Sequence, residues 1–333
     1  MSSELAFRDC INLENTVLPS EYESRHEPHS HIFVIHDFVS TALRNNQSAY
    51  CWRITAAGQG RYVASDWFKP FDTIYRVITP SRIIGLNYGS AYADLFYESC
   101  RQLHIADWPS YIRSLVPGVV SHEQATNLLI EKLRELARTN AFRTRIWHLQ
   151  HDPIRNFQVC ERFVEKLFER RSRYVVIRVD LGYLAAVSGV TTGSAKRDFA
   201  RFLKNAKSNR TLFGDLAGYV WKMEYGEDRR HHFHVALFFT KKNGLRAAYW
   251  AQQIGEYWCR EITDGKGTYH NCHRNVYLHN GIGEVNRADQ QKRAHLLRAI
   301  RYFFKAEQVL PVMPGEGRHR SFGKGFKNNR QGA

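Results

Sequence analysis

Two histidines separated by a single residue, His232 and His234, lie in an apolar segment and could bind a metal ion. The alternation from His231 to Thr240 predicts a β-strand, in which neighbouring side chains point to opposite faces. Both imidazoles would then lie on one face, about 7 Å apart along the strand, with Phe233 in the core on the other face. Two neutral imidazole nitrogens in this arrangement can converge on one cation.

A glutamate on the preceding strand is the candidate third ligand. Residues 218–225 predict a strand that forms a hairpin with the histidine strand, and a turn centred near Asp228 places Glu224 opposite His232 and diagonal to His234. Oxygen and nitrogen ligands without a thiolate favour Mg²⁺ or Mn²⁺ acting on phosphate over a structural zinc site. The alternative for Glu224 is an exposed glutamate paired with a basic neighbour.

Two other histidine groups fit a metal site less well. His29 and His31 have the same spacing, but the residue between them is polar and no hairpin supplies a carboxylate, so we interpret them as structural or surface histidines. His270, Cys272 and His273 are too close in sequence and lack a fourth partner. We therefore interpret this second group as residues of an edge strand.

Tyr302 is the candidate nucleophile. On a predicted helix over 289–308, positions three and four residues apart share a face, so Tyr302 lies beside Lys305 and Arg298. A phenol with a pKa near 10 is almost entirely protonated at neutral pH, and nearby cations are needed to stabilise its anion. The alternative is an ordinary tyrosine on an amphipathic helix.

Together these residues predict cleavage of a phosphodiester. A bound metal would polarise the phosphate, and attack by Tyr302 would form a phosphotyrosine and release a hydroxyl group. Because this exchange conserves the phosphoester, the strands could be rejoined without ATP. The sequence has no Walker motif, since Gly265-Lys266 and Gly323-Lys324 are each followed by glycine.

Composition excludes a disordered chain, because 43% of the 333 residues are hydrophobic. Residues 1–150 hold 15 basic and 15 acidic residues, and residues 151–333 hold 33 and 17, so the formal charge of +16 comes from the second part. This asymmetry predicts a polyanionic partner, and single-stranded DNA fits the chemistry above. The candidate DNA-binding residues are Arg298, Arg301, Lys324 and Lys327. Charge that serves only solubility is the alternative.

The six cysteines are scattered without a Cys-x-x-Cys pair, so they predict neither a disulfide framework nor a cysteine-only zinc site. The amino terminus lacks the pattern of a signal peptide, and no apolar run approaches the length of a membrane span. We therefore expect a cytoplasmic protein with no membrane partner.

Three parts are expected along the chain: a mixed N-terminal domain at 1–155, a second domain at 156–314 and a flexible basic tail at 315–333. A turn at Asp152-Pro153 followed by a helix at 159–171 marks the entry to the second domain. The N-terminal part predicts strands at 50–56 and 60–64 and helices at 91–103 and 123–137. The second domain predicts strands at 174–181, 218–225, 231–240 and 268–278 and helices at 193–208, 245–262 and 289–308. This order indicates an α+β fold, an antiparallel sheet backed by helices in a split β-α-β arrangement.

Residues 160–325 resemble the HUH-superfamily tyrosine endonucleases, in particular the replication initiators of filamentous bacteriophages and prophages. The likeness is carried by His232-Phe233-His234, the upstream Glu224, the strand 175–181 and the segment Tyr302-Phe303-Phe304-Lys305. It implies a ferredoxin-like palm and a metal-dependent nickase that cuts single-stranded or extruded origin DNA. The enzyme would stay linked to the 5′ phosphate and leave a 3′ hydroxyl for rolling-circle replication. It further implies a bacterial host cell that supplies the helicase and polymerase.

Two other functions fit parts of this pattern. A transposase or a mobilisation relaxase of the same superfamily would use the same chemistry on other DNA ends. A noncatalytic protein could bind single-stranded nucleic acid through Phe322, Lys324, Phe326 and Lys327, without any need for Glu224 or Tyr302. The N-terminal domain could serve recognition or the formation of a homo-oligomer.

Overall fold

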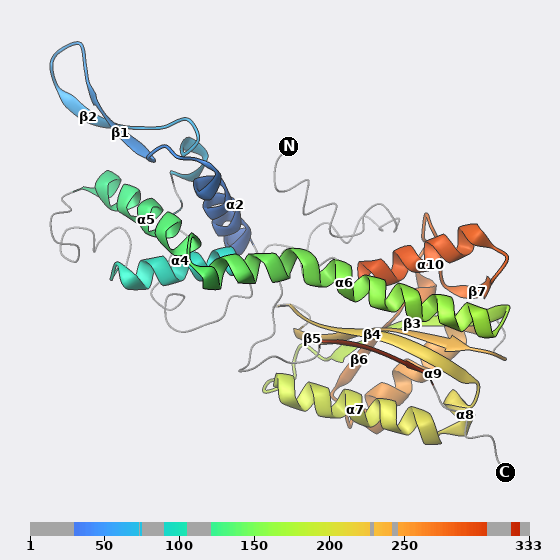
Figure 1. Ribbon diagram of the computed structural model, residues 1–333. Coiled ribbons are helices and arrows are strands. Elements are labelled where there is room, and N and C mark those ends of the chain that lie inside the picture. The colour runs from blue at the N-terminus through green and yellow to red at the C-terminus, as the bar shows by residue number, and fades with distance from the viewer. Residues whose placement is uncertain are drawn as a thin grey trace. The chain divides into compact units, whose positions relative to one another are not determined.

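A computed structural model of the chain describes residues 30–72, 74, 90–104, 121–226, 230–241, 246–304 and 321–326 (Figure 1). The described residues separate into two compact units, one that ends at His148 and one that begins at Leu149.

The N-terminal unit combines helices with a two-stranded antiparallel hairpin. Its elements are α2 (Ser30–Arg44), β1 (Tyr50–Ile54), β2 (Gly60–Ala64), α4 (Ala91–Gln102) and α5 (His122–Ala137). The two strands and the last two helices confirm the sequence prediction, and α2 has no counterpart in it. Helices α4 and α5 begin where they do because the hydroxyls of Ser90 and Ser121 accept hydrogen bonds from backbone N–H groups of the first turn.

Helix α6 (Asn140–Arg170) shows that the expected turn at Asp152-Pro153 is wrong, because Pro153 lies buried inside this helix. An interior proline removes a backbone hydrogen bond and costs about 3 kcal/mol. The apolar face that follows it, which includes Phe163 and Leu167, is buried in a core, and this burial offsets the local cost. None of the helices in the described ranges is long and apolar enough to span a membrane.

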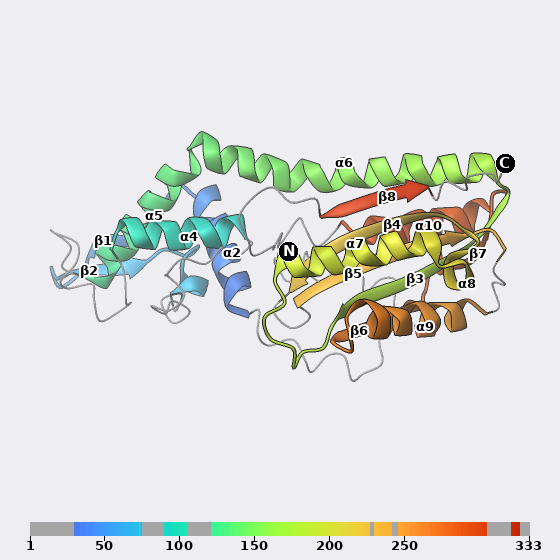
Figure 2. The ribbon, with the colours of Figure 1, turned by 90° about the horizontal axis from the view of Figure 1, so that it is seen from below.

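The C-terminal unit is built on an antiparallel sheet, which confirms the expected α+β class. Its strands are β3 (Arg173–Tyr183), β4 (Leu216–Gly226), β5 (Arg230–Phe239), β6 (Gly267–Asn271), β7 (Gly283–Asn286) and β8 (Phe322–Phe326). Their order is β6-β3-β5-β4-β8, and β7 pairs with the opposite end of β3 from β6 (Figure 2). Strands β3, β5 and β4 are therefore central, each with both edges paired.

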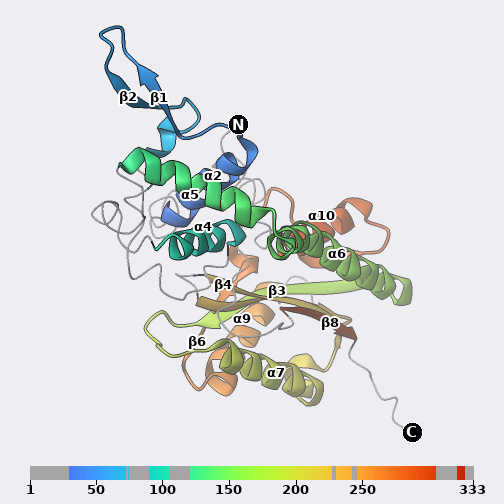
Figure 3. The same ribbon diagram turned by 60° about the vertical axis from the view of Figure 1, so that its left-hand side comes forward.

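Helices cover both faces of this sheet (Figure 3). They are α7 (Thr192–Ser208), the short α8 (Arg210–Phe213), α9 (Ala247–Tyr257) and α10 (Gln290–Tyr302), together with the C-terminal part of α6. Along β3, Ile177 and Val179 pack in one core with α7 and α9, whereas Tyr174 and Val176 pack in a second core with α6 and α10. This period-two alternation assigns every side chain of the central strands to one of two faces.

One expected strand is shorter in the structure. The segment 268–278 forms β6 only as far as Asn271, because the side-chain oxygen of Asn271 accepts a hydrogen bond from the His273 N–H and starts a 3₁₀ turn at Cys272–Arg274. Strand β7 has no counterpart in the sequence prediction, since four residues are too few to show an alternation.

The last two expected helices are present with different ends. The segment 245–262 corresponds to α9 and a π-helical turn, Trp258–Ile262. Trp258 is buried there and its indole N–H donates to the Gly182 carbonyl, a tertiary bond that fixes the irregular turn. The segment 289–308 forms α10, and its last four residues, 305–308, lie outside the described residues.

The expectation of a flexible tail from residue 315 is wrong for its middle part, because Phe322–Phe326 form strand β8 beside β4. Phe322 packs against Phe304, and Phe326 packs against Phe163 of α6. The glycines between these rings leave room for aromatic side chains of β4. Five basic residues against one acidic residue in 315–333 suggested a tail, but pairing with a distant strand stabilises the segment.

The core between the sheet and α7 can be tested at Phe199. Its ring stacks on Phe233 with centroids 4.2 Å apart and an interplanar angle of 6°. We expect Phe199→Ala to lower the free energy of unfolding by about 3–5 kcal/mol, as a buried aromatic leaves a cavity. Urea unfolding measures this. The control Leu184→Ala, at a side chain that is 44% exposed, should change it by less than about 1 kcal/mol. Equal losses in the two variants would contradict the assigned core.

Candidate metal centre beside Tyr302

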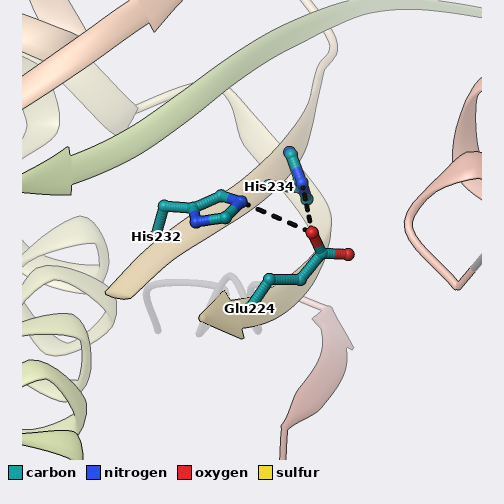
Figure 4. Close-up of side chains that lie close together, drawn as sticks. All are labelled: Glu224, His232 and His234. Carbon is teal, nitrogen blue, oxygen red and sulfur yellow. Dashed lines mark hydrogen bonds and ion pairs between the residues drawn. The ribbon is translucent and has the colours of Figure 1, made fainter. Parts of the chain in front are cut away.

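The two expected histidines and the expected glutamate meet on one face of the β4–β5 hairpin (Figure 4). The register pairs Glu224 with His232, which confirms the hairpin register inferred from the sequence. In the part of the chain that the structure describes, Glu224, His232 and His234 form the one such group whose potential ligand atoms all lie within 4.8 Å of one another.

A single carboxylate oxygen of Glu224 faces both imidazoles. Its Oε2 lies 3.4 Å from His232 Nε2 and 3.1 Å from His234 Nε2. The two rings are nearly perpendicular, with centroids 5.0 Å apart. Two nitrogens and a carboxylate oxygen suit a divalent cation, and three protein ligands leave coordination positions for water or a substrate oxygen.

Asp180 on β3 contacts the other nitrogen of His234, and sequence reasoning missed it. Its Oδ1 lies 2.8 Å from His234 Nδ1, because the register of β3 and β5 places the two residues opposite each other. A carboxylate at this position fixes the orientation and tautomer of a metal-binding imidazole. A signal was present in the sequence: a charged residue within the apolar run of β3 needs a partner on the same face of the sheet.

The charges of this group shift one another's pKa values. Burial alone would lower the pKa of His234, but Asp180 and Glu224 outweigh it and raise that pKa to about 9. Burial alone would raise the pKa of each carboxyl group, and the facing charges, His234 first, instead hold both well below their usual range. Without a metal, the centre is therefore a protonated imidazole between two carboxylates.

Tyr302, the expected nucleophile, lies beside this group at the end of α10. Its ring centroid is 6.0 Å from that of His234, and the tyrosine is half-buried. The next residue, Phe303, is fully buried and stacks on the His234 ring at 5.5 Å. Residues far apart in the sequence thus place a phenol and a candidate metal centre on the same face of the sheet.

Arg178 supplies a buried cation at the tyrosine, which sequence reasoning also missed. Its guanidinium carbon lies 5.3 Å from the ring centroid of Tyr302 and 5.2 Å from that of Phe303. These distances are within the range of cation–π contacts. The same side chain lies 3.9 Å from Asp180, so one buried arginine contacts both the tyrosine and the support of the metal ligand.

The other expected cations are distributed differently. Lys305 and Lys327 lie outside the described residues. Arg298 is half-buried on α10, whereas Arg301 is exposed and its guanidinium lies over the Phe157 ring. Lys324 lies on β8 with its ammonium over Phe163. Among the described residues, Arg178 is therefore the cation that contacts the Tyr302 ring.

The rival histidine groups do not form a second cluster of three ligands in the described ranges. His29 and the side chain of His31 lie outside them. His270 is exposed, and burial raises the pKa of the Cys272 thiol above its usual range. His273 Nε2 accepts a hydrogen bond from the backbone N–H of Arg178, and burial lowers its pKa to about 4.

Comparison with family models matches residues 136–325 to the YagK/YfjJ C-terminal domain. The matched region includes the six-stranded sheet except Phe326, the candidate metal centre and Tyr302. No curated protein and no solved structure matches the chain.

We expect the affinity for Mn²⁺ to rise between about pH 6.5 and about pH 8.5, because the ion must displace the proton that His234 holds below its pKa of about 9. Release of one proton predicts a gain of about tenfold per pH unit. Titration calorimetry with MnCl₂ measures it. The control His279→Ala, outside the cluster, should keep the wild-type profile, and an affinity independent of pH would contradict the assignment.

Proposed function

We propose that the chain, which belongs to the YagK/YfjJ C-terminal domain family, is a metal-dependent DNA nicking and joining endonuclease, because it carries a candidate metal centre beside Tyr302. Its substrate is single-stranded origin DNA, and its intermediate is a 5′-phosphotyrosine. The product, a free 3′ hydroxyl, starts rolling-circle replication. In this proposal Mg²⁺ or Mn²⁺ is the cofactor, and a helicase and a polymerase of the bacterial host act in the same cytoplasm.

The observation that carries this proposal is the position of Tyr302 against His234, at 6.0 Å between ring centroids. The alternative is that Tyr302 is an ordinary tyrosine at the end of an amphipathic helix, with no chemical role. Here the same face holds two imidazoles and a carboxylate that can bind a cation. A bound Mg²⁺ or Mn²⁺ would polarise the phosphate that the phenolic oxygen attacks.

The chain's own residues prepare the tyrosine and the ligands for this reaction. Asp180 holds His234 in orientation through Nδ1, so that Nε2 points to Glu224. Arg178 places a permanent positive charge beside the tyrosine, which favours the phenolate over the neutral phenol. Phe303 stacks on His234 and limits its rotation. These contacts provide order before any substrate binds.

The arrangement of strands supports the same proposal. In chain order, β3, β4, β5 and β6 are the four strands of a β-α-β-β-α-β unit, and their order in the sheet is β6-β3-β5-β4. This order agrees with the split β-α-β topology of the ferredoxin-like palm that we propose. The crossovers are α7 between β3 and β4 and α9 between β5 and β6.

The packing of β8 favours catalysis over a purely noncatalytic role. The rings of Phe322 and Phe326, which could stack on unpaired bases, instead pack on Phe304 and Phe163. Both rings are only half-exposed. A transposase or relaxase would use the same residues, and the choice of DNA ends is what separates it from a replication initiator.

We expect Tyr302→Phe to abolish the covalent protein–DNA product, with a loss of about 10³-fold or more, because the nucleophilic oxygen is removed. The ring remains, so folding and DNA binding should change little. Single-stranded DNA with a 3′ label, incubated with MnCl₂ and separated under denaturing conditions, measures the product. The control Tyr249→Phe alters an exposed tyrosine on α9 and should behave as wild type. Wild-type nicking by Tyr302→Phe would overturn the proposed function.

A further inference from the structure

Helix α7 lies on the side of the sheet opposite to α6 and α10 (Figure 1), and so opposite to the candidate metal centre. From Thr192 to Arg210 the chain holds six basic residues and one acidic residue, Asp198, which accepts a hydrogen bond from Tyr183. The exposed cations follow one another at intervals of three and four residues. We define the α7 basic face as the four of them that lie on this helix: Arg197, Arg201, Lys204 and Lys207.

The α7 basic face has little neutralising charge around it. In the described ranges, its one recorded ion pair joins Arg201 to Asp264 at 3.9 Å, and the carboxylate side chain of that pair is 76% exposed. Like charges three and four residues apart repel each other and destabilise a helix. The spacing of these cations therefore lowers the stability of α7 when no partner is bound.

Helix α6 of the same unit serves as a comparison, because its charged side chains also face the solvent. Between residues 149 and 170 it holds four basic and four acidic residues that alternate along the helix. Two of its acids are paired: Asp152 with Arg155 at 3.0 Å, and Glu165 with Arg293 of α10. Alternating charges of both signs, as on α6, are sufficient for solubility. The excess of cations on α7 therefore indicates a role other than solubility.

We propose that the α7 basic face binds the phosphate backbone of duplex DNA. From Arg197 to Lys207 the cations extend over about 15 Å of helix, a length along which one DNA strand presents about four phosphates. Phosphate contacts of this kind position a protein on DNA without reading its sequence. The choice of DNA over RNA rests on the proposed function, whereas the binding of a charged backbone rests on the helix alone.

A duplex is favoured over a single strand because α7 offers charge without a surface for stacking. Proteins that bind single strands use exposed aromatic rings on which bases stack. The aromatic residues of α7, Phe199 and Phe202, are both buried in the core, and no large apolar side chain of α7 is exposed. A row of cations on a rigid helix is suited to the regular backbone of a duplex.

The test is the salt dependence of binding by the full chain to a blunt 20-base-pair DNA duplex in EDTA, followed by fluorescence anisotropy. The α7 variant carries Arg197→Gln, Arg201→Gln, Lys204→Gln and Lys207→Gln. The matched control carries Arg155→Gln, Arg162→Gln and Lys166→Gln on α6 and Arg171→Gln directly after it, which removes the same charge from exposed side chains. Glutamine keeps helix propensity, so both variants should fold, and thermal unfolding checks this.

We expect the α7 variant to lose up to about 3.6 from the slope of log affinity against log salt, or about 0.9 per phosphate contact. Its affinity at low salt should fall by about 10²-fold or more, and that of the control by less than about tenfold. An unchanged slope, or equal losses in the two variants, would overturn the proposal. So would a loss confined to duplex RNA or to phosphatidylglycerol vesicles. Because EDTA prevents metal-dependent cleavage, Tyr302→Phe should bind as wild type here whether or not the proposed function holds.

Discussion

The interaction on which the candidate site depends is the contact of one imidazole with two carboxylates. His234 is buried between Asp180 on Nδ1 and Glu224 on Nε2. Each charge would be costly to bury alone, and each is stabilised by the others. The contact exists only when β5 is paired on both sides, with β3 supplying one carboxylate and β4 the other. The centre of the sheet and the centre of the site are therefore the same three strands.

The alternation of side chains along the strands places the candidate site on one face of the sheet and a supporting aromatic core on the other. On β5, Phe233 points away from the two histidines and stacks on Phe199 of α7. That aromatic core anchors the strand from behind and so helps to hold the imidazoles on the other face in register. Phe303 completes the enclosure from α10 by stacking on His234. The two faces can carry different functions because a residue on one cannot reach the other.

The basic residues also differ between the two faces of the sheet. On the α10 face, Arg178 is buried and its position is fixed by two rings and a carboxylate. On the opposite face, the cations of α7 are exposed and have few acidic neighbours. A buried, fixed arginine suits one reacting group, whereas a row of mobile exposed cations suits an extended polyanion. The net charge of the chain conceals this difference, which only the placement of each side chain shows.

The sequence by itself determined the hairpin register and so brought Glu224 to His232 and His234, because a tight turn and a two-residue period are local properties. It also indicated most helices and strands of the sheet. Only the tertiary structure decided that Asp180 supports His234, since that contact needs the pairing of strands distant in sequence. The same holds for β8, whose stability comes from its neighbours, and for Pro153, whose local cost is offset by packing. Local signals specify which side chains share a face, and long-range pairing decides which of those faces meet.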